Sequence, residues 1–167
     1  GFAALGLSLA AQLWSVVGIL AQQLLLPLFY RSVATNDVTG DYKANSEALS
    51  DLLNIMGPTY LIVAAATILG ADALMALLTA QQYQGAAIFL MIGAVTECCR
   101  ALASALGNAS QVTKRTISLS PPYAIGALFS LSGVFLAGYL RLDLSLIGLA
   151  LIAGSVAMLA TMAWRMR

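Results

Sequence analysis

The sequence contains no histidine and few charged residues of either sign. Histidine is the commonest metal ligand and a frequent general base, so its absence excludes histidine-based catalysis. The net charge of +1 provides no basic field that could hold a nucleic acid, and no nucleic-acid partner is expected. Only 9% of the residues are charged, against about 25% in a typical soluble domain, whereas 60% are hydrophobic. A soluble fold of this size has too little interior for so many apolar side chains, so the lipid bilayer is the expected environment.

Cysteine is also scarce, and the sequence contains no obvious reactive centre. The two cysteines, Cys98 and Cys99, are adjacent within an apolar run, which favours packing over a disulfide or redox chemistry. We expect no metal, no cofactor and no enzyme activity, since nothing at bilayer depth combines a nucleophile with a base. The chain enters apolar sequence directly at Gly1 and has no signal-peptide pattern, so we expect a fragment of a longer chain.

Several apolar runs are long enough to cross a bilayer, which takes about 20 residues in a helix. They predict an all-α polytopic integral membrane protein with about five transmembrane helices, and residues 1–167 form a single transmembrane helical region. The expected helices cover residues of about 2–30, 58–78, 85–106, 115–140 and 144–164. Residues 31–57 are expected to be a cytoplasmic loop, whose segment from Asn45 to Met56 should form an amphipathic helix that runs along the membrane interface into the next span.

Glycine, proline and one acid predict local breaks in the helices. Gly57-Pro58 indicates a kink or a restart before the second span. Asp72 suggests that this span ends near Gly70 and that a short interfacial continuation follows. Gly107-Asn108 has the pattern of a helix stop. Pro121-Pro122 predicts a kink in the fourth helix.

The fifth helix has small residues at helical spacing. Ala150 and Gly154 are one turn apart and predict a close contact with another helix.

The principal candidate site is the pair Glu97 and Arg100, set in the apolar run of the third helix. One helical turn separates the two side chains, so they share a face and can neutralise each other. A charge near the bilayer centre costs roughly 2.5 to 3.5 kcal/mol on insertion scales, so such residues usually face a protein interior or a watery cavity. The pair is therefore a candidate to line a substrate cavity. It is also compatible with a structural role in which it fixes one helix against its neighbours.

Polar side chains of the first helix are further candidates for a cavity wall, because polar groups in lipid turn inward to find partners. Interhelical hydrogen bonding is the more ordinary explanation for them. These residues are Gln12, Ser15, Gln22 and Gln23.

The basic residues sort unevenly between the two sides of a five-span arrangement. One side carries Arg31, Lys43, Lys114, Arg115, Arg165 and Arg167, and the other carries Arg141. By the positive-inside rule the first side is cytoplasmic. We therefore expect the C-terminus in the cytoplasm and the protein in the inner, or plasma, membrane.

Diffuse motifs along most of the chain resemble the C-terminal lobe of a polysaccharide flippase. They are the run Leu26-Pro27-Leu28-Phe29-Tyr30-Arg31, the Gly40-Asp41 loop, and Leu74 to Tyr83 leading into Gln84-Gly85-Ala86-Ala87. The chain resembles the multidrug/oligosaccharidyl-lipid/polysaccharide exporter superfamily, whose bacterial members include O-antigen translocases. The resemblance implies part of a MATE-like two-lobe transporter, with the N-terminal lobe of the same protein as the missing partner.

The resemblance also implies a function. Two lobes would rock around a polar cavity and flip a lipid-linked oligosaccharide or polysaccharide precursor across the membrane by alternating access. Arg100 would bind the diphosphate of the substrate, Glu97 would hold Arg100 or bind a coupling proton, and Gln22 and Gln23 would line the cavity. The alternatives are a multidrug exporter of the same superfamily and a non-transporting membrane scaffold subunit.

Overall fold

The computed structural model describes residues 1–39, 42–112, 120–140 and 144–165, and for some of them, including Gln22 and Lys43, the backbone alone. The regular secondary structure of these ranges is entirely helical. The elements are α1 (Phe2–Thr39), α2 (Tyr42–Leu69), α3 (Ala71–Leu78), the 3-10 helix η1 (Gln81–Ala86), α4 (Ala87–Val112), α5 (Ser120–Tyr139) and α6 (Leu144–Arg165). Five of the helices are long and apolar enough to cross a membrane, which confirms the predicted all-α class and number of spans.

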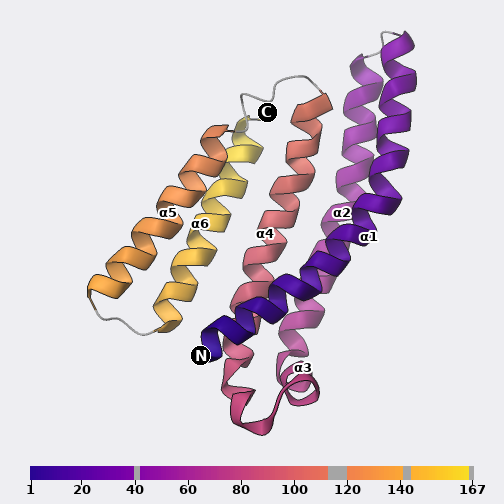
Figure 1. Cartoon of the computed structure of the whole chain (residues 1–167). Coiled ribbons are helices and arrows are strands. Elements are labelled where there is room, and N and C mark those ends of the chain that lie inside the picture. Colours follow the sequence, from indigo (N-terminus) through magenta and orange to yellow (C-terminus); the bar gives the residue numbers. More distant parts are fainter. Residues whose placement is uncertain (40–41, 113–119, 141–143, 166–167) are drawn as a thin grey trace.

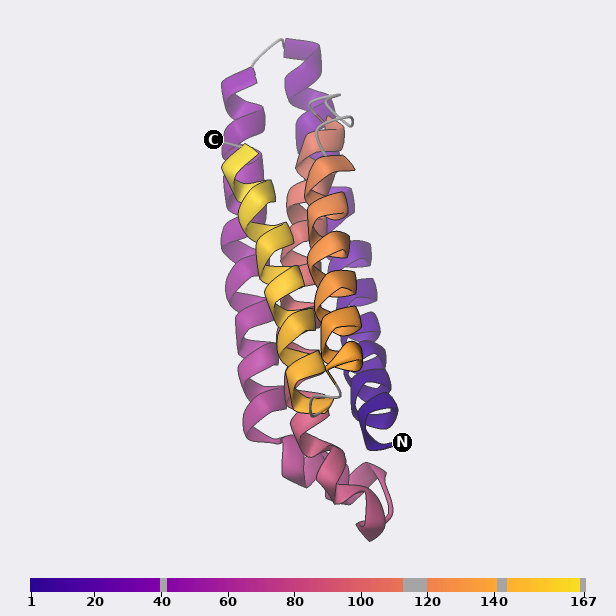
Figure 2. The same cartoon turned by 90° about the vertical axis from the view of Figure 1, so that its left-hand side faces the viewer.

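Helix α4 is at the centre of the bundle. It packs against α1, α2 and α6, whereas α5 packs chiefly against α6. The α1–α2 pair and the α5–α6 pair therefore lie on opposite sides of α4 (Figure 1). Figure 2 shows the long helices side by side, with α3 and η1 beyond them at one end and the C-terminal ends of α1, α4 and α6 toward the other.

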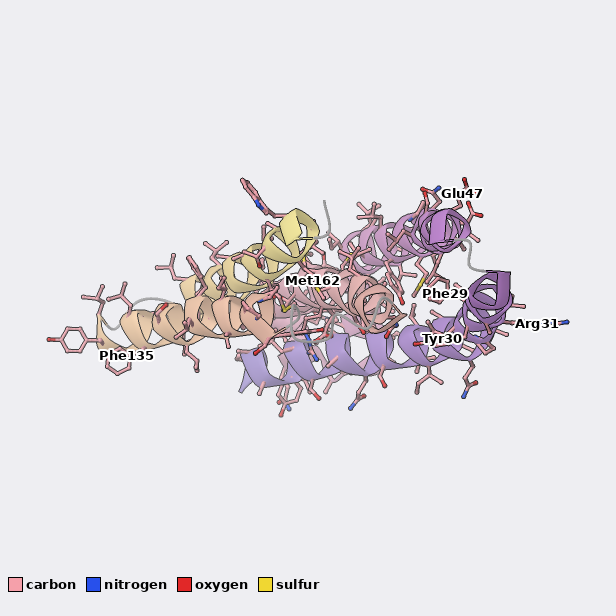
Figure 3. All side chains as sticks on the ribbon, turned by 90° about the horizontal axis from the view of Figure 1, so that it is seen from above. Phe29, Tyr30, Arg31, Glu47, Phe135 and Met162 are labelled. Carbon is pink, nitrogen blue, oxygen red and sulfur yellow. The ribbon has the colours of Figure 1, made fainter. Side chains whose placement is uncertain are left out.

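Small residues allow α4 to approach its neighbours closely. A Cβ added at Gly93 of α4 would lie 2.5 Å from the Cβ of Ala10 in α1, and one added at Gly148 of α6 would lie 2.5 Å from Cδ1 of Ile92. Further along the α4–α6 contact, Met162 is 1% exposed and lies between the two helices (Figure 3). Close approach of backbones is the usual means of helix association in lipid, where burial of apolar surface adds little.

The loop predicted before Asn45 is wrong, because helix occupies almost all of it, whereas the helix predicted from Asn45 to Met56 is present as part of α2. Helix α1 continues to Thr39 and α2 begins at Tyr42. The amphipathic face expected at the membrane interface is buried instead, since Leu52 and Met56 form a core cluster with Phe29 of α1. Tertiary packing of such a face supplies most of the stability of a helix, and here it outweighs the polar composition of the segment.

Helix α1 is much longer than a membrane is thick. Its 38 residues extend for about 57 Å, against about 30 Å for the hydrocarbon core. Figure 1 shows a bend along α1, whose one internal proline is Pro27. Proline removes the hydrogen bond to the carbonyl four residues earlier, at Gln23, and is the usual cause of such a bend.

The restart predicted at Gly57-Pro58 and the stop predicted at Gly107-Asn108 are wrong, while the alternative of a kink at Gly57-Pro58 stays a prediction. Helix α2 runs through Gly57-Pro58 without a restart, and α4 passes Gly107-Asn108 and ends at Val112. Gly107 is buried within α4.

The two remaining predicted breaks are the end of the second span near Gly70 and the kink at Pro121-Pro122. Helix α2 ends at Leu69 and the short α3 follows from Ala71, as the position of Asp72 predicted. Pro121-Pro122 lies in the first described turn of α5, so the kink predicted there falls at the edge of the described residues and stays a prediction. The earlier part of the predicted fourth helix, with Lys114 and Arg115, lies outside the described residues, as do Arg141 and Arg167.

Candidate functional site

Four helices enclose a polar cleft with a volume of about 710 Å³. Each helix contributes residues at helical spacing, so a single face of each one forms a wall of the cleft. The lining residues are Ala11, Trp14 and Ser15 of α1; Glu97, Arg100, Ala101 and Ser104 of α4; Tyr123, Gly126, Ala127 and Ser130 of α5; and Gly154, Ser155 and Met158 of α6.

Polar groups converge in this cleft from the middle of every span that borders it. Ser15, Glu97, Ser130 and Ser155 come from four different helices, and each lies well inside its apolar segment. In hydrocarbon such groups would lose their hydration without compensation. Their convergence on one cleft indicates a site that holds water or polar ligand groups at bilayer depth.

The ion pair on α4 is the only charged feature among the lining residues. Nη1 of Arg100 donates a hydrogen bond of 2.7 Å to Oε1 of Glu97. The side chain of Arg100 is 63% exposed and that of Glu97 is 19% exposed, so the guanidinium is the more accessible partner. Among the described residues neither group bonds to another helix, so the pair does not tie α4 to a neighbour there.

Hydroxyl and indole groups complete the polar lining. Ser15, Ser104 and Tyr123 are exposed to the cleft. The hydroxyl of Ser155 donates to the carbonyl oxygen of Leu151 at 2.9 Å, which leaves its oxygen able to accept. These groups are neutral hydrogen-bonding partners of the kind that sugar hydroxyls and phosphate oxygens require.

The wall between α5 and α6 depends on two facing glycines. A Cβ at Gly126 would lie 2.8 Å from the Cβ of Met158, and one at Gly154 would lie 3.0 Å from the carbonyl oxygen of Gly126 and would overlap Oγ of Ser130. The predicted contact face of Ala150 and Gly154 is therefore confirmed, with α5 as the partner helix. It closes the far side of the cleft.

A second hollow, between α1, α2 and α3, has a different chemistry. Its volume is about 600 Å³ and its lining is almost entirely aliphatic. Its one hydroxyl, on Thr67, donates to the carbonyl oxygen of Val63 at 2.8 Å, so the polar groups there are satisfied. This hollow resembles ordinary lipid-facing surface, whereas the polar cleft does not.

In comparisons with protein-family models, curated proteins and solved structures, the chain matches none. Within the described ranges no three Cys, Asp or Glu side chains gather closely enough to hold a metal ion. The cleft itself is lined by hydrogen-bonding groups and one ion pair.

The cleft brings together some of the residues that the sequence indicated. Arg100, Glu97 and Ser15 line it, whereas Gln12 and Gln23 are exposed on α1 and are not among the lining residues. The side chain of Gln22 lies outside the described part of the chain.

Other lining residues were missed by reasoning from sequence. They are Trp14, Ser104, Tyr123, Ser130 and Ser155. For the serines, the sequence contains only a weak indication of a site. A serine in the middle of an apolar span often bonds the backbone of its own helix, so its presence alone predicts no binding site.

Proposed function

We propose that this chain is one lobe of a membrane transporter that flips a lipid-linked oligosaccharide or polysaccharide precursor across the bacterial inner membrane. In this proposal the polar cleft receives the phosphate-bearing headgroup of the substrate while the lipid tail stays in the bilayer. The second lobe of the same protein covers the open side of the cleft, and the two lobes rock to expose it alternately to each side. No covalent chemistry is required.

The observation that carries the proposal is the accessibility of Arg100 at bilayer depth. Its side chain is 63% exposed within the cleft, although a charge at this depth is costly in lipid. A guanidinium stays charged in any surroundings and forms paired hydrogen bonds to phosphate oxygens. The serine hydroxyls around it suit the remaining phosphate oxygens and the sugar.

The relative exposure of the two charges also favours an anionic substrate over a cationic drug. A drug exporter of the same superfamily would present its acid to the cavity, yet Glu97 is 19% exposed and is already bonded to Arg100. A scaffold subunit would be expected to use the pair between helices, whereas the bond lies within α4. Flipping of an anionic headgroup is therefore the better-supported function.

Replacing Arg100 by lysine tests this proposal in the complete transporter. The substitution keeps the positive charge but removes the planar group that bonds two phosphate oxygens at once. We expect normal expression and a transport rate reduced at least about tenfold, since a charge-assisted hydrogen bond contributes roughly 1.5 to 3 kcal/mol. Unchanged transport of the labelled lipid-linked substrate would refute a phosphate-binding role for Arg100.

A further inference from the structure

Trp14 combines burial with an unsatisfied hydrogen-bond donor. The residue is 4% exposed, and its Nε1 is the one buried side-chain polar atom of the described residues without a hydrogen-bond partner. Buried indole N–H groups usually find an acceptor, because leaving a donor unpaired is costly. Trp14 lines the polar cleft, and its ring packs against Tyr60 at a centroid distance of 5.7 Å, so packing holds it in place.

Trp14 of α1 and Glu97 of α4 line the same cleft. The two helices run in the same direction (Figure 1), and a Cβ added at Gly93 of α4 would lie 2.5 Å from the Cβ of Ala10 in α1. One turn further along each helix are Trp14 and Glu97. Trp14 also shares a core cluster with Cys98, the residue that follows Glu97. Two donors therefore share the cleft with this acid: Arg100, which already bonds it on α4, and the indole of Trp14 on α1, which has no partner among the described residues.

We propose that Glu97 exchanges partners when an anion enters the cleft. Without an anion its carboxylate binds the guanidinium of Arg100. A phosphate that binds Arg100 displaces the carboxylate, which turns to accept the hydrogen bond of Trp14 Nε1. Glu97 is thus a built-in competitor for the anion, and Trp14 is a positioning residue that stabilises the anion-bound arrangement. The inference rests on the proposed function in taking a phosphate-bearing anion as the ligand.

The geometry of the ion pair suits such an exchange. One hydrogen bond, from Nη1 of Arg100 to Oε1 of Glu97, joins the two side chains. Strong Arg–carboxylate bridges have two parallel hydrogen bonds, so this ion pair is of the weaker kind. A phosphate group can bond two guanidinium nitrogens, and the displaced carboxylate would be stranded without a new donor. Neither α5 nor α6 contributes a Lys, Arg, Asp or Glu to the lining, and Tyr123 is their one ionisable group there, so the lining offers no second cation for the displaced carboxylate.

Binding of labelled inorganic pyrophosphate to the chain in lipid nanodiscs tests the exchange. Glu97→Gln removes the competing charge and is expected to tighten binding about tenfold, and Trp14→Phe is expected to weaken it about tenfold, as for one hydrogen bond to a charged group. In the Glu97→Gln background, Trp14→Phe should have no further effect, because no carboxylate then needs the indole. Trp164→Phe is the matched control, because Trp164 is 82% exposed and does not line the cleft.

A second measurement applies to the unaltered chain and does not depend on whether a variant folds. The indole N–H proton of Trp14 should move downfield in a ¹⁵N–¹H spectrum when pyrophosphate binds, while that of Trp164 stays in place. A Trp14 resonance that does not move on saturation, or a Trp14→Phe variant that binds as tightly as the original chain, would overturn the exchange alone. If neither the original chain nor the Glu97→Gln variant binds pyrophosphate, the proposal of an anionic substrate is overturned as well.

Discussion

Glu97 and Arg100 are the residues whose two interpretations can be separated most directly. If the pair is structural, removing one charge strands the other at a cost of about 3 to 5 kcal/mol, and replacing both restores folding and activity. If Arg100 binds substrate, the double variant folds but does not transport. We expect the second result for Glu97→Leu with Arg100→Leu in the complete transporter. Normal transport by a well-expressed double variant would favour the structural role.

The facing glycines of α5 and α6 allow a test of the cleft wall. Gly154→Ala places a methyl group against the Gly126 carbonyl and Ser130, and we expect it to destabilise the folded chain by about 1 to 3 kcal/mol. Gly138→Ala is the matched control, because a Cβ there meets no atom within 4 Å and alanine favours the helix. Thermal unfolding in detergent measures both. Equal stability of the two variants would show that Gly154 is not packed closely against Gly126 and Ser130.

Among the elements, the long α1–α2 pair departs most from the sequence-based prediction, and Phe29 holds its two helices together. Phe29 is 6% exposed within a cluster that includes Leu52 and Met56, whereas its neighbour Leu28 is 66% exposed. We expect Phe29→Ala to lower the free energy of unfolding by about 3 to 5 kcal/mol. Leu28→Ala should change it by less than about 0.5 kcal/mol. A larger effect at Leu28 would place the packed face of α1 elsewhere.

Helix α5 illustrates why apolar composition identifies spans but not their neighbours. Phe135 is 76% exposed and points away from the bundle (Figure 3), while Gly126 on the same helix is buried against α6. The sequence is apolar on both faces, so hydrophobicity alone does not say which face meets protein. The small residues carry that information, since their contacts require a particular partner at a particular register.

At the scale of the whole molecule, the orientation in the membrane is still a prediction. The C-terminal ends of α1, α4 and α6 lie toward one end of the bundle, as alternating spans require (Figures 1 and 2). The charge pattern predicts that this end is cytoplasmic. Single cysteines at Lys114 and Arg141, in a background of Cys98→Ala and Cys99→Ala, test it by labelling intact cells. We expect an external reagent to reach position 141 and not 114, and the reverse would invert the orientation.

The sequence by itself determined the class of the protein and the position of its charges. Composition indicated a membrane protein, run lengths predicted five helices able to span a bilayer, and the one-turn spacing of Glu97 and Arg100 placed them on one face of a helix. These are local properties of a chain in lipid, where each helix satisfies its own backbone hydrogen bonds. Local rules also placed the end of the second span near Gly70.

Only the tertiary structure decided which helices meet and what surrounds the charges. Leu52 and Met56 are buried against Phe29 of α1 instead of lying at a membrane interface, and α4 continues past the stop expected at Gly107-Asn108. The cleft exists because α1, α4, α5 and α6 bring together residues that are more than 100 positions apart in sequence, such as Ser15 and Ser155. No local pattern predicts such a meeting, since it depends on the register of small-residue contacts between helices.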